Sequence, residues 1–163
     1  MDDASAAALA RLVRGQRIAA LGTLRHGAPL VSMVLYLPAG DFSAFHLHVS
    51  RLAWHTQDML ADPRVSLSIA ATDDGQRNPQ ALERVSVRGE ARPIGNDSPD
   101  HAPLKAQWLA RFPESAIQFE LADFQFFRLA PHDARFVAGF GSIHNLSSAG
   151  LVSASAFGSN SPA

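Results

Sequence analysis

Short stretches in which apolar and polar side chains alternate recur along this chain of 163 residues, and they constrain its fold more than any other feature. A period of two is typical of β-strands, whose successive side chains point to opposite faces of a sheet. The alternation and β-branched content predict strands over residues 17–24, 30–37, 45–49, 65–70, 82–91, 123–129 and 134–138. We therefore expect a mainly β (α+β) protein, a small closed antiparallel barrel with peripheral helices rather than a parallel doubly wound fold.

Helical patterns interrupt the strands at three places. Residues 3–14, 52–61 and 99–111 carry apolar side chains at helical spacing. Ser50 stands where the N-cap of the second helix belongs, and the proline that follows each of the last two helices would end it. Residues 147–163 are mostly Ser, Ala and Gly. We expect a single domain over residues 1–146 and a flexible C-terminal tail over 147–163.

The strand over residues 45–49 alternates without interruption. Its apolar positions would point inward and would leave His46 and His48 together on the opposite, outer or interface face. In a later strand, Phe126 falls on the opposite face from Phe127. Because a small barrel cannot bury every one of the chain's phenylalanines, we expect Phe126 to take part in a dimer contact.

Composition narrows the choice of partners and of compartment. The formal net charge is -1 and 18% of the residues are charged, so the chain lacks the broad basic field that nucleic acid attracts. Cysteine is absent, which removes disulfides and thiolate chemistry. No apolar run is long enough for a membrane span, and the first residues lack the positive region of a secretion signal. These features favour a cytoplasmic protein that binds neither nucleic acid nor membrane.

The junction between the third strand and the second helix is the segment richest in anion-binding groups. Hydroxyls of Ser50 and Thr56, the Arg51 guanidinium, the His55 imidazole and free backbone amides of a helix start could together hold a phosphate ester. The alternative is that Ser50 only caps the helix and that Arg51 is only solvated.

Other kinds of site find little support. His46 and His48 share a strand face, but no third ligand stands at a supporting spacing, so we expect no metal site. The stretch from Gly139 to His144 lacks the third glycine of a dinucleotide loop. Neither a nucleophile elbow nor a phosphate-binding Gly-Lys-Ser/Thr loop occurs.

The order of these pieces resembles a known family. The segments that carry the resemblance are residues 19–24, 28–32, Ser50-Arg51-Leu52-Ala53-Trp54-His55-Thr56, 61–67, Arg84-Val85-Ser86-Val87-Arg88-Gly89, 123–129 and 135–141. In order and spacing they are similar to the pyridoxamine 5′-phosphate oxidase-like FMN-binding split barrels, and most similar to the branch with haem-utilisation (HugZ-like) proteins. The resemblance covers most of residues 5–146 and implies a split β-barrel of about six to seven antiparallel strands.

The resemblance also implies a homodimer with flavin mononucleotide (FMN) at the subunit interface. By position it assigns the FMN phosphate to Ser50, Arg51, His55 and Thr56. It places the flavin ring against the strand over 30–37, which is apolar on both faces, and against the next strand; the residues concerned are Ser32, Met33, Val34, His46 and Leu47. Asp58 departs from the family pattern, in which many members have Asn, and a carboxylate there would repel a phosphate.

Three functions follow from the resemblance. The first is an FMN-dependent oxidoreductase acting on a small-molecule substrate or reductant, with catalytic residues unassigned because the flavin itself carries the electrons. The second is a haem-binding or haem-degrading protein of the same fold, with His144 or His132 as the candidate iron ligand. The third is a non-enzymatic flavin-binding scaffold.

Overall fold

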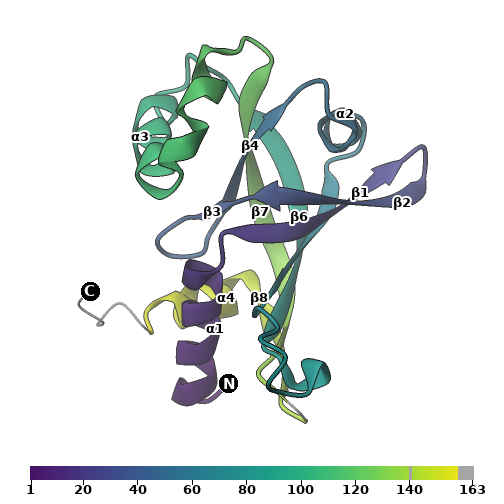
Figure 1. Ribbon diagram of the computed structural model, residues 1–163, viewed down its shortest axis with the longest axis vertical. Helices are drawn as coiled ribbons and strands as arrows, with labels where there is room; N and C mark the ends of the chain where they lie inside the picture. The colour runs from purple at the N-terminus through teal and green to yellow at the C-terminus, as the bar shows by residue number, and fades with distance from the viewer. Residues whose placement is uncertain (140, 158–163) are drawn as a thin grey trace.

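A computed structural model describes residues 1–139 and 141–157 of the chain (Figure 1). Its centre is an eight-stranded antiparallel sheet with the strand order β2-β1-β5-β6-β7-β4-β3, and β8 pairs with β7. The strands are β1 (Ile18–Arg25), β2 (Ala28–Leu35), β3 (Leu37–Pro38), β4 (Phe45–Ser50), β5 (Arg64–Ala70), β6 (Arg84–Ile94), β7 (Phe124–Val137) and β8 (Ile143–Ser147). The sheet curls so that β2 comes into contact with β4, which confirms the predicted antiparallel split barrel.

Helices lie at the periphery of the barrel, as the sequence predicts. They are α1 (Asp3–Gly15), α2 (Trp54–Ala61), α3 (His101–Arg111) and α4 (Ser148–Ser155), with the 3-10 helices η1 (Pro79–Ala81) and η2 (Pro113–Glu120). None of the helices in the described part of the chain is long and apolar enough to cross a membrane.

The main core fills the concave side of the sheet. Apolar side chains of β1, β5, β6 and β7 point into it, and α1 covers it with Leu9 and Val13. The Tyr36 hydroxyl donates a hydrogen bond of 2.7 Å to the Val13 carbonyl and so joins the sheet to that helix. Burial and this hydrogen bond hold α1 in place against the barrel.

A second core lies on the other face of β4 and β7. There α3 and η2 pack on the sheet, and Leu37, Leu104, Trp108, Phe112 and Phe126 form the buried cluster. The ring of His48 stacks on Phe119 with ring centroids 4.1 Å apart. The expectation of an outer or interface face for His48 and of a dimer contact for Phe126 was therefore wrong, because both side chains are buried within one protomer.

The C-terminal segment also differs from the prediction. Residues 147–157 are not a loose tail: Ser147 caps α4 by accepting a hydrogen bond from Gly150 N, and Leu151 and Ala154 are buried. Arg14 donates hydrogen bonds to the carbonyl oxygens of Ser155 (2.6 Å) and Phe157 (2.9 Å). A segment poor in large apolar side chains is ordered here because α1 provides a surface and a cation for it. The rest of the expected tail, residues 158–163, lies outside the described residues.

Strand β7 and helix α2 have different bounds from those that the sequence predicts. The two strands expected over 123–129 and 134–138 are one strand of 14 residues, β7, with a bulge opposite Arg88 and Gly89 that accommodates Pro131 and His132. Helix α2 begins at Trp54 with Ala53 as its N-cap, so Ser50 does not cap it. The Ser50 hydroxyl instead donates to the Asp123 carboxylate and accepts a 3.1 Å hydrogen bond from Leu52 N.

Candidate functional site

The convex side of the sheet, away from the main core, carries a flat floor of small side chains. Residues paired across antiparallel strands share a face, so the strand register places Ala20 beside Ser68, Ser68 beside Ser86, and Gly22 beside Ser66. The buried residues that alternate with them, such as Leu67, point into the main core. We call this surface the outer face; its members are Ala20, Gly22, Val31, Met33, Ser66, Ser68, Ser86, Arg88, Asp133, Arg135 and Asn145.

One end of the outer face is apolar and open to water. Val31 and Met33 on β2 are 69% and 67% exposed, and neighbouring Ile18 on β1 is 51% exposed. With Ala20 and Ser68 they line a groove of about 420 Å³. Such a contiguous exposed apolar surface is typical of a site for a ligand or a second protein chain.

The other end of the outer face is polar and carries cations. Arg88 on β6 forms a bidentate ion pair with Asp133 on β7, with both N–O distances 2.8 Å, and Arg135 donates a 3.0 Å hydrogen bond to Asn145 on β8. The Arg88 guanidinium lowers the pKa of Asp133. These residues line a cavity of about 560 Å³ that also includes Ser66 and Ser86. The outer face thus joins an apolar groove to an arginine-lined cavity over a floor of small side chains.

The segment predicted to hold a phosphate has other partners. Ser50 donates to the Asp123 carboxylate, and Arg51 donates a 2.9 Å hydrogen bond to the Ala122 carbonyl. Thr56 is fully buried, and neither its hydroxyl nor the buried Nε2 atom of His55 has a hydrogen-bond partner among the described residues. Burial lowers the pKa of His55, so its ring is neutral near pH 7. A neutral imidazole and an adjacent carboxylate make this segment a weaker anion site than its residue types suggest.

Asp58, which departs from the family pattern, forms hydrogen bonds and an ion pair within the fold. Its carboxylate accepts 3.0 Å hydrogen bonds from the Thr23 hydroxyl and from Arg25, which also lies over the Trp54 ring at 4.2 Å from the ring centroid. The ion pair fixes α2 against β1.

The residues predicted to line a flavin ring point in several directions. Met33 lies on the outer face, whereas the side chains of Val34 and Leu47 belong to the main core. Ser32 is half-buried opposite Leu21 and lines the same groove as Met33, whereas His46 lines a separate cavity beside α3. Within one protomer the predicted flavin residues do not converge on a single pocket, and their role in FMN binding stays a prediction.

Residues 5–138 match the family model described as pyridoxamine 5′-phosphate oxidase. The chain belongs to this family. Among curated proteins it is similar to the non-canonical heme oxygenase HOZ of Arabidopsis thaliana, a chloroplastic protein, with 36% identity over 69% of this chain and 33% of that protein. It therefore spans about a third of the length of this relative.

Two further members carry names that refer to haem. Heme oxygenase HutZ of Vibrio cholerae is 28% identical over 77% of this chain and 71% of that protein. The solved structure of a heme binding protein from Mycobacterium smegmatis covers 94% of this chain and 62% of its own, with a TM-score of 0.82 and 24% identity. The latter likeness supports the fold alone.

In this family member the two histidines proposed as iron ligands lie in different surroundings. His132 is exposed at the β7 bulge, beside Asp133 at the polar end of the outer face. His144 pairs with the buried Phe136 and stacks on its ring, with ring centroids 6.2 Å apart, so it lies on the core side of β8. The described residues contain no group of three or more His, Cys, Asp or Glu side chains that could hold a metal ion by themselves.

Sequence reasoning missed the floor and the arginines of the outer face. A usable signal existed in β5, where Ser66 and Ser68 alternate with buried apolar residues and so mark an outward face of small side chains. Arg88 and Arg135 could not be connected with that face from the sequence, because only the strand register brings β5, β6 and β7 together in the right alignment.

Proposed function

We propose that this chain binds haem on the outer face and takes part in haem degradation. The observation that carries the proposal is the continuous path from an apolar groove, over small side chains, to two arginines. A porphyrin is flat and apolar over most of its area and carries two propionates at one edge. Small side chains let such a ring lie close to the backbone, and arginine is the preferred partner of a carboxylate.

The chain's own residues have distinct parts in this proposal. Val31 and Met33 would cover the apolar edge of the ring and exclude water from it, while Arg88 and Arg135 would hold the propionates. His132 is the histidine placed beside this face and is the candidate iron ligand from this chain. Bound haem iron would supply the oxygen chemistry that ring cleavage requires.

The relatives support haem as the ligand. Two curated proteins that this chain resembles are named as heme oxygenases. The chain spans only part of the Arabidopsis protein. Haem binding and haem degradation are therefore separate parts of the proposal, and each needs its own test.

FMN is the second candidate, since the family description is that of an FMN-dependent type of enzyme and an isoalloxazine ring would also suit the floor. If FMN is the ligand, the protein would be an FMN-dependent oxidoreductase with a small-molecule reductant, or a flavin-binding scaffold without activity. A phosphate at the expected segment would have to replace the hydrogen bonds of Ser50 and Arg51 to Asp123 and to Ala122, just as a haem propionate would have to compete with Asp133 for Arg88.

An absorption titration tests the proposal. Haem added to the purified protein is expected to give a shifted Soret band that saturates, and Arg88→Gln combined with Arg135→Gln is expected to weaken haem binding by about tenfold or more, because two charge-assisted contacts are lost. Arg92→Gln is the matched control, since Arg92 is on β6 but pairs with Glu90 away from the cavity.

A different outcome of the same titration would overturn the haem assignment. Flavin absorption bands that co-purify with the protein, together with haem binding unchanged in the double variant, would move the chain to the FMN reading. If haem binds as expected, loss of its Soret band after addition of ascorbate in air would support degradation, and a stable band would leave haem binding alone.

A further inference from the structure

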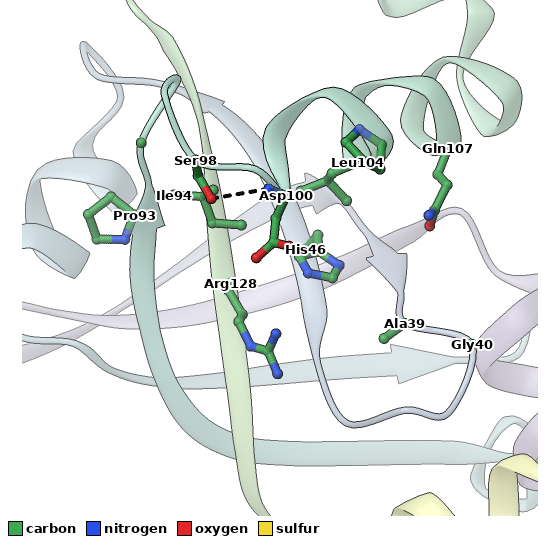
Figure 2. Close-up of a pocket in the computed structure, with 12 residues that line it drawn as sticks. Ala39, Gly40, His46, Pro93, Ile94, Ser98, Asp100, Leu104, Gln107 and Arg128 are labelled. Atoms are coloured by element: carbon green, nitrogen blue, oxygen red, sulfur yellow. Dashed lines mark hydrogen bonds between the residues drawn. The ribbon is translucent and has the colours of Figure 1, made fainter.

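A second cavity lies further along β6 and β7, on the same side of the sheet as the outer face, and is lined by different residues. It has a volume of about 510 Å³ and lies between the β3–β4 turn, the end of β6 and the start of α3 (Figure 2). It shares no lining residue with the groove or the cavity of the outer face. Its size is that of a small-molecule site.

Three titratable side chains meet in this cavity. His46 on β4 is paired directly with Arg128 on β7, and all three side chains line the cavity; Figure 2 shows the His46 ring beside the Asp100 carboxylate and the Arg128 side chain further along β7. Neither the Arg128 guanidinium nor the Asp100 carboxylate makes a hydrogen bond or ion pair with any described residue, and the buried Nδ1 atom of His46 has no hydrogen-bond partner. A cation and an anion are therefore both available to a ligand, beside the His46 ring.

Arg128 differs from several other arginines of the sheet. Arg64, Arg88 and Arg92 are exposed arginines of the same sheet, and each forms an ion pair with a nearby carboxylate. Asp100 is the N-cap residue of α3, yet its side chain makes no cap hydrogen bond. The Asp100 backbone is helical (φ -78°, ψ -18°) and not extended as in a side-chain-capping N-cap residue, so its carboxylate stays free of the helix and lines the cavity.

The walls add an apolar surface. Ile94 and Leu104 extend into the cavity from the edge of the second core, and Pro93 and Pro103 stand beside them. Burial, reinforced by the Arg128 charge, lowers the pKa of His46 against the opposing influence of the Leu37 carbonyl and Asp100. The ring is therefore neutral near pH 7 and has one nitrogen that accepts and one that donates.

We propose that this cavity binds a small zwitterion of the amino-acid class with an apolar side chain. The carboxylate of the ligand would pair with Arg128, its ammonium group with Asp100, and its side chain with Ile94 and Leu104. A simple organic anion would meet the Asp100 carboxylate, and a simple amine would meet the Arg128 guanidinium. A zwitterion satisfies both charges at once.

Isothermal titration calorimetry of the full chain with three related probes tests the proposal. The probes are L-leucine, 4-methylpentanoate, which lacks the ammonium group, and 3-methylbutylamine, which lacks the carboxylate. L-leucine is expected to bind at least about tenfold more tightly than either of the others, because each of them leaves one charge-assisted contact unmade.

Matched variants locate the site. Arg128→Gln and Asp100→Asn are each expected to weaken L-leucine binding by about tenfold or more, while Arg64→Gln and Asp3→Asn, which do not line the cavity, are expected to bind as the wild type does. All four side chains are exposed, so their replacement leaves the cores intact. Haem-loaded protein is expected to give the same result, which separates this site from the outer face.

Three results would each overturn the proposal. The first is the absence of a binding heat with L-leucine at millimolar concentration, and the second is L-leucine binding that survives both Arg128→Gln and Asp100→Asn. The third is 4-methylpentanoate binding as tightly as L-leucine, which would make the cavity a site for simple anions.

Discussion

Gly89 lies on β6 at the bulge, where the backbone of β7 comes unusually close. A Cβ atom at this position would be 2.1 Å from the Ala130 carbonyl oxygen and 2.9 Å from its carbonyl carbon. The obstacle is backbone, which cannot rotate away as a flexible side chain could. A residue other than glycine would therefore separate β6 from β7 at the point where the long strand changes register.

We predict that Gly89→Ala destabilises the protein by roughly 3 kcal/mol, at the upper end of the cost of overpacking a buried site. Gly22→Ala is the matched control on β1, where a Cβ would meet the Ser66 carbonyl oxygen at an ordinary 3.6 Å. Urea unfolding of both variants measures the difference. Equal midpoints for Gly89→Ala and the wild type would show that the two strands lie further apart than described.

Among the secondary-structure elements, strand β4 contributes side chains to both cores. Phe45 and Leu47 on one face enter the main core, while His48 on the other is enclosed by Trp108, Phe119, Phe124 and Phe126. Burial lowers the pKa of His48 to about 4, opposed by Gln118 and reinforced by His101 and Lys105. The native structure therefore holds this ring neutral.

This enclosure predicts acid sensitivity. The unfolded chain takes up a proton at His48 near pH 6.5 and the native protein only near pH 4, so stability is expected to fall as pH falls through this window, by at most about 3 kcal/mol from this group. His48→Leu is expected to reduce the slope, leaving a remainder from His46 and His55, whose pKa values are also lowered by burial.

Thermal unfolding between pH 7 and pH 4 measures this slope. The control is His132→Ala in haem-free protein, because His132 is exposed and its loss removes no buried ring. An unchanged slope in His48→Leu would contradict the account.

At the level of elements, the sequence predicts each strand that alternates, because burial of one face leaves its mark on every second residue. The sequence does not predict the burial of a side chain when the residues that cover it come from a distant part of the chain. The second core covers Phe126 and His48 only because α3 and η2 fold back over them, and α4 is ordered only because Arg14 and α1 receive it. The candidate site shows the same limit, since Arg88 and Ser66 become neighbours through strand register alone.

For the molecule as a whole, the outer face has to be considered together with the homodimer that the resemblance implies. Ile18, Val31 and Met33 expose an apolar surface to water at one end of this face. A second copy of the chain laid over that end would remove this surface from water and would enclose one side of the proposed haem site. We therefore propose this end as the dimer contact.

We predict that the wild-type protein sediments as a dimer and that Met33→Glu sediments as a monomer with an unchanged circular dichroism spectrum, because a buried carboxylate at the contact is costly. Leu52→Glu is the control, since Leu52 is 76% exposed but lies in the turn between β4 and α2 and not on the outer face. A wild-type monomer, or a dimer that survives Met33→Glu, would remove this contact from consideration.

The packing of α4 against α1 bears on how the protein is made in the cell. The partner surface of the helix at residues 3–15 is supplied by residues 148–157, which leave the ribosome last among the described residues. Until then Leu9 and Val13 have only part of their cover, and the nascent barrel exposes apolar surface to chaperones and to other nascent chains. Synthesis rate and chaperone supply should therefore affect the yield of folded protein more than its final stability suggests.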